Sequence, residues 1–260
     1  MTQTNLFTPS APASAKVRAK PFLKWAGGKT QLLPELTALL PRALTDPSQA
    51  FGGRYFEPFM GSAALFFHLA PNLAPGRAFL GDMNEELVLT FLAVRDHPDA
   101  LLESLAEYDR KHNGPKYDGA PDFGAQSALY YAVRGLDREP EWRADAYRDP
   151  ERLVARAARF IYLNRTCFNG LWRVNRKGHH NVPMGRYQNP GIYNPKLLEQ
   201  AHAALQGVDV QHRSFEATAA AAGAGTSSTS IRPICRSRLR RRSTPTRKTP
   251  FSSPPTKSWR

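Results

Sequence analysis

Apolar residues recur at two different spacings in the first hundred residues, and the change from one spacing to the other predicts strands and helices in turn. Five leucines in residues 29–41 share one helical face, and Pro41 ends that helix. The short apolar runs RYFEPF (residues 54–59) and RAFLGD (residues 77–82) have the length of strands. Each run leads into a helical pattern, at residues 63–70 and 84–97, and Asn84 is placed to cap the second helix.

This order of strand, glycine turn, helix, strand, acid and helix is typical of a nucleotide-binding α/β sheet. Helical patterns fill residues 97–166, and residues 170–187 alternate around a turn like a β-hairpin. A further helix closed by Gly207 precedes a third strand at residues 208–215. We therefore predict an α/β core formed by residues 20–95 and 207–225, with a mostly helical insert at residues 96–206.

Charge is distributed unevenly along the 260 residues. The formal net charge is +14, but ten of the Lys and Arg residues lie in residues 226–260, which contain no Asp or Glu; residues 1–225 carry only +4. A nucleic-acid partner must therefore be argued from local patches rather than from the overall charge.

The number of cysteines and the hydropathy of the chain indicate its redox environment and its relation to membranes. Cys167 and Cys235 are too few for a disulfide framework or a cysteine-rich zinc site, so we expect a reduced environment and no metal. No run has the length of a signal peptide core or a membrane span, and residues 1–19 have the composition of a disordered lead-in. We expect a cytoplasmic protein with no membrane contact; nothing in the sequence sets an oligomeric state.

The stretch AGGKT at residues 26–30 raises the possibility of a phosphate-binding P-loop. That loop requires a glycine at position 23, where Leu23 stands, which argues against this class of nucleotide hydrolase. The stretch can still contact a ligand. Gly27 and Gly28 permit close approach of the backbone, Trp25 can stack on a ring, and Lys29 offers a positive charge.

Two further features stand where the predicted strands end. Glu57, Pro58, Phe59 and Gly61 form a glycine-containing turn after the first strand, where an open α/β sheet binds nucleotide-like ligands. Asp82 ends the second strand, and a carboxylate there suits the two hydroxyls of a ribose. The alternative for Asp82 is a helix-capping acid.

Residues 164–195 are rich in arginine, asparagine and aromatic side chains. Arginine can read guanine with two hydrogen bonds, asparagine can pair with adenine or contact phosphate, and an aromatic ring can wedge into a base stack. An ordinary solvated hairpin is the alternative. The density of such residues favours nucleic acid: Arg165, Phe168, Trp172, Arg173, Arg176, Lys177 and Arg186.

Three separate stretches together resemble one family. PFLKWAGGKTQLLPEL, YFEPFMGSAALFF with AFLGDMNEEL, and NRTCFNGLWRVN with NVPMGRY are similar, in order and spacing, to Dam-type adenine-N6 DNA methyltransferases over about residues 20–225. The resemblance implies a Rossmann-like methyltransferase sheet that binds S-adenosylmethionine, and an inserted target-recognition domain that binds double-stranded DNA. It implies methylation of adenine N6 at GATC after the base is flipped from the duplex, as in restriction-modification enzymes.

The resemblance also assigns residues to roles. Matching the cofactor-binding positions are Trp25, Gly27, Gly28, Lys29, Glu57, Pro58, Phe59, Gly61 and Asp82. Matching the DNA-recognition positions are Asn169, Leu171, Arg173 and Pro183, with Phe168 as the aromatic inserted into the duplex. His179 and His180 stand where such relatives carry an acidic residue and an aromatic residue.

The catalytic motif of that family, Asp-Pro-Pro-Tyr at the end of its fourth strand, does not occur in this sequence. Its place would be near Ile231, Arg232, Pro233 and Ile234, in the acid-free basic tail. If the gene is read one base out of register after Gly225, the shifted codons permit a strand-like run that ends in Asp-Pro-Pro-Tyr. A frameshift would explain together the lost motif, its position and the abrupt change of composition.

We therefore predict that residues 226–260 are a disordered, out-of-frame tail and that the chain as written is inactive. Two alternatives stay open. The tail can be a genuine low-complexity segment that binds nucleic acid, or the chain can be a catalytically dead remnant that still binds DNA or the cofactor.

Overall fold

The computed structural model describes residues 19–114 and 122–222. The predictions for residues 1–18 and 226–260 lie outside these ranges. In chain order the elements are η1 (Lys29–Leu32), α1 (Leu33–Leu39), α2 (Arg42–Thr45), β1 (Tyr55–Glu57), α3 (Ala64–Leu69), η2 (Ala70–Asn72), β2 (Ala78–Asp82), α4 (Glu85–Asp96), α5 (Pro98–Asn113), α6 (Phe123–Gly135), η3 (Leu136–Arg138), η4 (Pro140–Arg143), α7 (Pro150–Thr166), η5 (Phe168–Gly170), α8 (Pro195–Leu205), β3 (Asp209–His212) and α9 (Phe215–Ala222).

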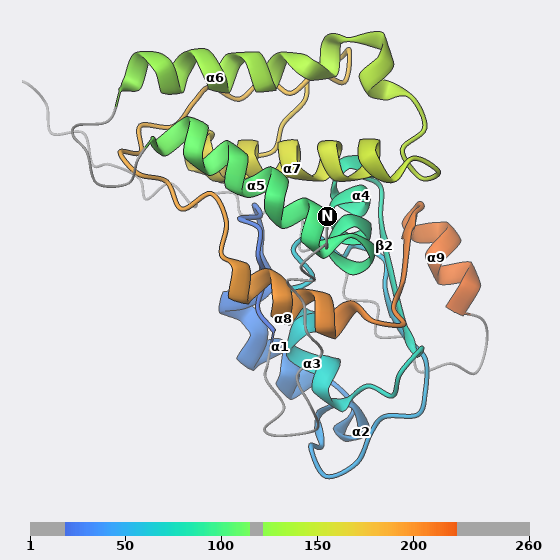
Figure 1. Cartoon of the computed structure of the whole chain (residues 1–260). Helices are drawn as coiled ribbons and strands as arrows, with labels where there is room; N and C mark the ends of the chain where they lie inside the picture. Colours follow the sequence, from blue (N-terminus) through green and yellow to red (C-terminus); the bar gives the residue numbers. More distant parts are fainter. Residues whose placement is uncertain (1–18, 115–121, 223–260) are drawn as a thin grey trace, which may run out of the picture.

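A small parallel sheet forms the lower part of the molecule, with the strands in the order β1-β2-β3. Glu57 pairs with Leu80, and Asp82 pairs with His212, so the carboxyl ends of the strands lie at one edge of the sheet. In Figure 1, α9 lies on one side of β2, and α3, α4 and α8 lie on the other. The mixed α/β architecture predicted from the sequence is confirmed.

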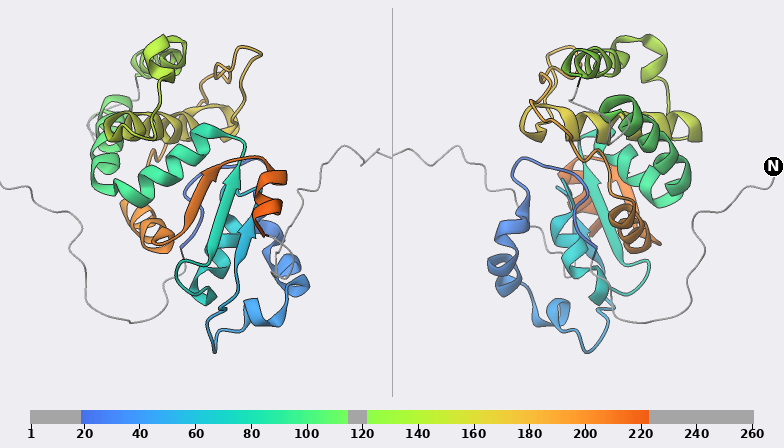
Figure 2. Two further views of the ribbon diagram at one scale, coloured as in Figure 1. Left: turned by 90° about the vertical axis from the view of Figure 1, so that its right-hand side faces the viewer. Right: turned by 60° about the vertical axis from the view of Figure 1, so that its left-hand side comes forward.

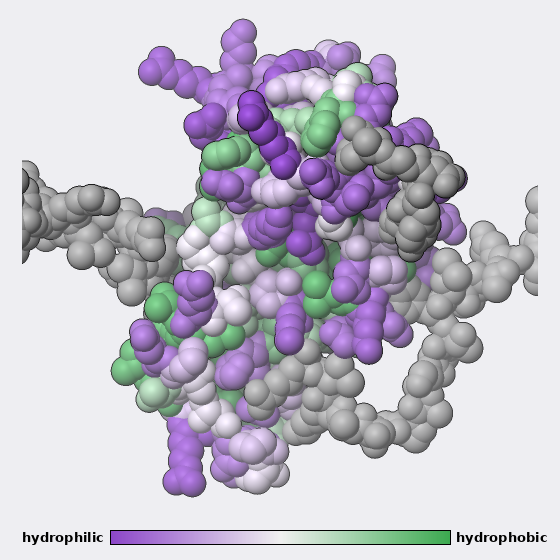
Figure 3. Space-filling view, turned by 90° about the vertical axis from the view of Figure 1, so that its left-hand side faces the viewer, coloured by the Kyte–Doolittle hydropathy of each residue, from purple (hydrophilic) through white to green (hydrophobic). Residues whose placement is uncertain are grey.

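Three of the helices between β2 and β3, namely α5, α6 and α7, lie above the sheet, whereas α4 and α8 flank it. Figure 2 shows the strands pointing toward this helical part. Hydrophilic side chains cover most of the face shown in Figure 3 at the height of α6 and α7. Among the described residues, no helix combines the length and the apolar character that crossing a membrane requires.

Local sequence signals account for the starts and ends of the main helices. Asn84, Asp149 and Asn194 each accept a hydrogen bond from the backbone N–H three residues ahead, and so cap α4, α7 and α8. Proline fills the first position of α7 and α8, where its missing N–H has no consequence. Gly207 has φ of 70° after α8, a conformation that glycine adopts without strain.

Two predicted elements differ from the structure. The helix expected over residues 29–41 is divided into η1 and α1. Leu33 and Leu40 pack against the core without being fully buried, and Leu39 is 82% exposed. The expected β-hairpin is not formed by strands. Residues 167–187, called the 167–187 loop below, contain η5 and two isolated antiparallel bridges, Cys167–Met184 and Val174–His180, the second of which spans the turn predicted at Arg176–Gly178. A few backbone hydrogen bonds join the arms of this loop, and side chains from α6 and η3 bind further backbone groups.

Candidate functional site

The carboxylate of Asp82 stands at the carboxyl end of β2 and joins two neighbouring segments. Its Oδ2 accepts a hydrogen bond from Gly61 N at 3.0 Å, and its Oδ1 accepts one from Asn84 N at 3.0 Å. The capping of α4 falls to Asn84, whose side chain accepts from Leu87 N. Asp82 therefore fixes the turn after β1 against the end of β2, instead of acting as the helix cap.

The turn after β1 is built around a buried glutamate. Glu57 is 4% exposed, and its Oε2 accepts hydrogen bonds from Tyr55 Oη at 2.8 Å and from Phe66 N at 3.1 Å. Burial raises the pKa of Tyr55 well above its usual value, and the charge of Glu57 raises it further. Pro58 is buried beside it. These two predicted cofactor-binding residues thus shape the turn from inside.

Gly61 brings this turn against the loop that contains Trp25. Gly61 has φ of 49°, and a Cβ on it would lie 2.9 Å from Trp25 Cδ1, so any side chain would collide with the indole ring. Gly28 N donates to Trp25 O at 2.9 Å, and a Cβ on Gly28 would lie 3.8 Å from Ser62 Oγ. The two turns predicted separately from sequence are therefore one site.

Within that loop Gly27 has φ of 76°, and a Cβ there would meet nothing within 4 Å, so the loop is open to solvent at this point. Lys29 begins η1 directly after it. On the opposite side of the turn after β1, the ring of Phe59 stacks on that of Phe215, with centroids 5.4 Å apart. Phe215 begins α9, and sequence reasoning missed it because it lies about 150 residues from Phe59.

The predicted DNA-recognition residues all lie on the 167–187 loop and share exposure to solvent. They are Phe168, Asn169, Leu171, Arg173 and Pro183. Phe168 is 52% exposed, although its backbone N–H donates to Pro183 O at 2.9 Å, which holds the two arms of the loop together. Arg173 Nε donates to Asn181 Oδ1 at 2.8 Å. An exposed apolar ring beside a loop of polar side chains suits insertion into a base stack.

Side chains from the preceding helices hold the backbone of this loop. Val182 O accepts from Tyr130 Oη at 2.9 Å and from Arg134 Nη1 at 3.2 Å. Asp137 Oδ2 accepts from His180 N at 2.7 Å and pairs with buried Arg159 at 2.8 Å. No local signal identifies these holding residues, because each lies about 40 to 50 positions before the backbone group that it contacts.

A cationic pocket of about 560 Å³ opens beside the loop. Lys24, Arg165 and Arg186 line it together with Tyr187, and no acidic residue does so. Burial, and then the charge of Arg165, lowers the pKa of Lys24, and burial lowers the pKa of Arg165. Cations that lose hydration without gaining an acidic partner favour an anionic ligand such as a phosphate.

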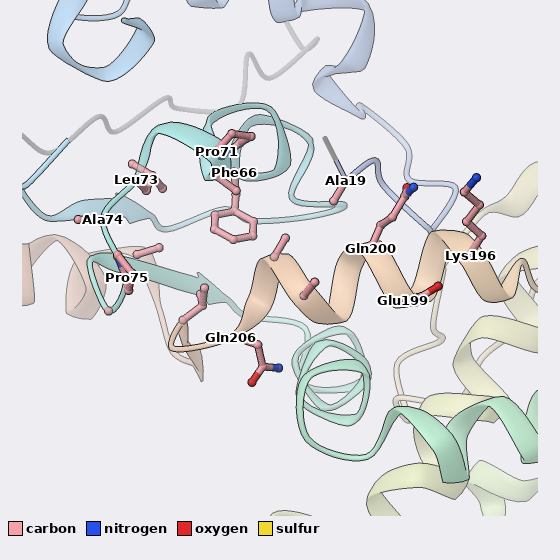
Figure 4. A pocket seen from close by; sticks show the side chains of 16 residues that line it. Ala19, Phe66, Pro71, Leu73, Ala74, Pro75, Lys196, Glu199, Gln200 and Gln206 are labelled. Atoms are coloured by element: carbon pink, nitrogen blue, oxygen red, sulfur yellow. The ribbon is translucent and has the colours of Figure 1, made fainter. Parts of the chain in front are cut away.

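A second cavity, of about 780 Å³, lies at the other end of the sheet. Figure 4 shows small and apolar side chains on the wall formed by the segment around Pro71, and polar side chains of α8, among them Lys196, Glu199 and Gln200, on the wall opposite. Ala78 and Val208, at the amino ends of β2 and β3, contribute to it. Because ligands of open α/β sheets bind at the carboxyl ends of strands, this cavity is separate from the site around Asp82.

His180 is a buried residue whose ring lies near the backbone of Leu171 and the carboxylate of Asp137, both of which favour its protonated form. Its ring lies 4.6 Å from the ring of Trp172, and neither nitrogen has a hydrogen-bond partner among the described residues. Burial, and then the charge of Arg159, lowers the pKa of His180 to about 4. The imidazole thus takes the place of an aromatic ring in the packing.

Comparison with known proteins assigns the chain to a family. Residues 25–227 match the model of D12 class N6 adenine-specific DNA methyltransferases. The chain is 36% identical to the type II methyltransferase M.MjaIII of Methanocaldococcus jannaschii, over 77% of this chain and 64% of that protein. It is 39% identical to the type II methyltransferase M1.LlaDCHI of Lactococcus lactis subsp. cremoris, over 71% and 54%. It is 32% identical to a DNA adenine methylase of Haemophilus influenzae, over 74% and 56%.

The chain belongs to the D12 class N6 adenine-specific DNA methyltransferase family. It spans between about half and two thirds of the length of these relatives.

We expect His180→Phe to stabilise the protein. The change removes two buried ring nitrogens without partners, and each such group costs about 1–3 kcal/mol. The folded-state pKa of His180 lies below that of the unfolded chain. Above about pH 6.5, the ordinary histidine value, neither the folded nor the unfolded state protonates this residue, and the free energy of unfolding does not depend on it. As the pH drops toward 4 the unfolded chain binds the proton first, so the free energy of unfolding falls. Denaturant unfolding at pH 7.5, 6 and 5 should show a higher midpoint and a smaller loss in acid for the variant.

His112→Phe provides the matched control. His112 is also buried with a lowered pKa, but its Nδ1 lies 2.9 Å from Tyr162 Oη, in a hydrogen bond that phenylalanine cannot make. We expect this variant to be less stable than wild type at pH 7.5. Equal destabilisation by both substitutions would show that His180 has a polar partner.

Proposed function

We propose that the chain carries the cofactor-binding and DNA-reading parts of an adenine-N6 DNA methyltransferase that uses S-adenosylmethionine and acts on double-stranded DNA at GATC. The proposal rests on one observation: the turns around Asp82 and the 167–187 loop lie next to each other. The turns at Trp25 and Gly61 adjoin Asp82 at the carboxyl end of the sheet, and the 167–187 loop lies directly beside them. A methyl donor and a flipped base require two such adjacent sites.

The residues around Asp82 fit the cofactor. Its carboxylate is the group that would accept hydrogen bonds from ribose hydroxyls, and Gly61, Gly27 and Gly28 keep the neighbouring backbone clear of side chains. Trp25 and Phe59 present half-buried ring surface on either side. The bound cofactor would supply the activated methyl group, while the protein positions the two reactants. A Rossmann-like methyltransferase sheet, of which β1, β2 and β3 are part, follows from this assignment.

The 167–187 loop fits DNA. In this proposal Phe168 fills the gap that a flipped adenine leaves, and Leu171, Arg173 and Pro183 contact base edges; their shared exposure on one loop supports these roles. The cations Lys24, Arg165 and Arg186 stand where the phosphate backbone would run. The relative from Haemophilus influenzae is named a DNA adenine methylase, and the motif positions of this chain support the same target base.

Catalysis requires groups that this chain does not contain as written. The lone pair of adenine N6 is delocalised into the ring, so acceptors must bind both N6 hydrogens before the nitrogen can attack a methyl group. In the family the carboxylate and a backbone carbonyl of Asp-Pro-Pro-Tyr provide these acceptors. The place of that motif, near Ile231, Arg232, Pro233 and Ile234, lies outside the described residues.

The fold leaves room for the missing strand next to β1. No described strand pairs with the outer edge of β1, and α9 packs across the sheet onto β1 and β2. Arg54 Nη2 donates to Ala222 O at 3.1 Å, so α9 ends beside the residue that precedes β1. A strand that follows α9 directly could therefore run parallel to β1 and end at the Glu57–Gly61 turn. We propose that the in-frame gene encodes this strand after Gly225, with Asp-Pro-Pro-Tyr at its end.

A catalytically dead remnant that binds DNA or the cofactor is the second candidate, because every cofactor- and DNA-contact residue named above lies before residue 226. A P-loop nucleotide hydrolase is not favoured: Leu23, at the position that needs a glycine, is 6% exposed and packs in the core.

We expect Asp82→Ala to weaken binding of S-adenosylhomocysteine by about 10- to 100-fold. Hydrogen bonds to a charged group contribute about 1.5–3 kcal/mol each, and 1.4 kcal/mol corresponds to a factor of ten. Titration calorimetry on the 260-residue chain would measure the change. Asp96→Ala is the control, since Asp96 lies at the far end of α4 and pairs with Arg95. Equal affinities of Asp82→Ala and wild type would remove Asp82 from the cofactor site.

We expect Arg173→Ala and Arg186→Ala to affect DNA binding in different ways. A base contact carries about 1–3 kcal/mol of discrimination, so Arg173→Ala should reduce the preference for GATC over a scrambled duplex by about tenfold. Arg186→Ala should weaken both duplexes alike and reduce the salt dependence of binding. Fluorescence anisotropy at two salt concentrations would separate the two effects. A uniform loss for Arg173→Ala would assign that residue to the backbone instead.

We expect the DNA sequence across codons 215–260 of the source gene to show one base inserted or missing. Expression of the restored frame should then give methyl transfer to a GATC duplex, and the 260-residue chain should give none. Replacement of the restored aspartate by alanine is the control for catalysis. Methyl transfer by the purified 260-residue chain would refute the proposal of an inactive chain. A confirmed reading frame would favour the remnant.

A further inference from the structure

We infer that Asn164 is a positioning residue that joins the cofactor turn to the DNA-reading loop, so that occupation of one site favours occupation of the other. This inference rests on the proposed function of the two sites. Asn164 lies in the last turn of α7 and is completely buried. It belongs to neither predicted set of binding residues.

The side-chain amide of Asn164 bonds to both segments at once. Its Oδ1 accepts from Lys24 N at 2.8 Å, and its Nδ2 donates to Lys24 O at 2.6 Å and to Gly170 O at 3.1 Å. Buried amides of this kind are costly to leave without partners. A shift of either segment away from α7 therefore breaks hydrogen bonds that also hold the other.

Contacts continue from Lys24 to the cofactor end of the sheet. Trp25, the next residue, packs on Gly61 so closely that a Cβ there would lie 2.9 Å from the indole ring. Gly61 N in turn donates to Asp82 Oδ2. Asn164 thus binds the backbone of Lys24, and the next residue, Trp25, packs on the Gly61 turn that Asp82 holds.

Contacts also continue from Gly170 into the DNA-reading residues. A Cβ on Gly170 would lie 2.7 Å from Lys24 Cβ, so the turn that carries Phe168 and Asn169 rests directly on Lys24. Gly170 has φ of 63° and Asn169 has φ of 55°, which makes the turn a defined, left-handed conformation rather than a loose loop.

A row of rings runs parallel to this hydrogen-bonded link. Trp25 lies 6.1 Å from Phe160, Phe160 lies 4.2 Å from Trp172, and Trp172 separates Leu171 from Arg173 in the 167–187 loop. Phe160 and Asn164 are four residues apart on α7 and therefore share one helix face. That face of α7 contacts both sites, through polar contacts at Asn164 and through ring packing at Phe160.

The expected consequence is a thermodynamic coupling between the two ligands. Ordering of the Trp25 turn by the cofactor would fix Lys24, and through Asn164 would fix the turn of Gly170 in the form that meets DNA. Coupling is reciprocal, so DNA must raise the affinity for the cofactor by the same factor.

The test measures that factor in the full 260-residue chain. Affinity for a GATC duplex is determined by anisotropy with and without saturating S-adenosylhomocysteine, and affinity for S-adenosylhomocysteine is determined with and without duplex. Couplings between sites are typically about 5- to 150-fold; we expect a wild-type factor of about tenfold that falls below about threefold in Asn164→Ala. Gly170→Ala, which pushes the turn away from Lys24 but leaves the Asn164 amide intact, should lose coupling in the same way.

Asn72→Ala is the matched control. Asn72 is also a buried asparagine, and its Nδ2 donates to the backbone carbonyl of Leu44 at 3.2 Å. It lies between Pro71 and Leu73, which line the cavity at the amino ends of the strands, at the opposite end of the sheet from Asp82. We expect a similar loss of thermal stability in Asn72→Ala and Asn164→Ala, but unchanged coupling in Asn72→Ala alone. If the two variants lose similar stability, a lower coupling factor in Asn164→Ala than in Asn72→Ala is not explained by the loss of stability.

The outcomes separate the inference from the function on which it rests. If wild type binds both ligands and Asn164→Ala and Gly170→Ala keep the wild-type coupling factor, the inference is wrong and the proposed function stands. If wild type binds both without coupling, the inference is equally wrong. If wild type binds neither, the proposed function fails and the inference fails with it.

Discussion

The burial of α7 is the constraint on which the arrangement of this protein depends. Twelve of its seventeen residues are buried, and they include two arginines and an asparagine. Buried charges and amides are stable only with partners, and each of these side chains finds them in a different segment. Arg156 pairs with Glu85 and Glu86 at the start of α4, Arg159 pairs with Asp137, and Asn164 binds Lys24 and Gly170. The polar groups of one helix thereby hold the helical part, the 167–187 loop and the first loop of the chain together.

The irregular form of the 167–187 loop follows from the same constraint. A hairpin with a continuous ladder would satisfy its own backbone; here only a few backbone hydrogen bonds join the arms, and Val182 O and His180 N are bound from outside by Tyr130, Arg134 and Asp137. The loop can therefore expose Phe168 and Pro183 without the regular alternation of a strand. His180 belongs to this arrangement as packing: its ring fills the space beside Trp172, and burial keeps it neutral.

The short sheet concentrates the proposed chemistry at one end. Three parallel strands place Asp82 and the turn after β1 at the same edge, directly below the helical part. The outer edge of β1 and the end of α9 at Arg54 mark where a further strand would join. The same topology explains why a large cavity at the amino ends of the strands lies apart from the candidate site.

The sequence by itself determined most of the elements and nominated the residues of the candidate site. The N-cap at Asn84, the strands around Phe56 and Leu80, and the βαβ order are local signals that the sequence carries on its own. The motifs also identified the family, because several short patterns in a fixed order are specific together although each is common alone.

Only the tertiary structure decided how these parts meet. The broken helix at η1 and α1 and the loop in place of the predicted hairpin depend on neighbours that no local pattern encodes. The same holds for Asn164, Phe215 and Asp137: each acts on a residue between about 40 and 150 positions away, and such contacts exist only when the chain has packed. Periodicity specifies which face of an element is apolar, but it does not specify which polar group a buried amide will find.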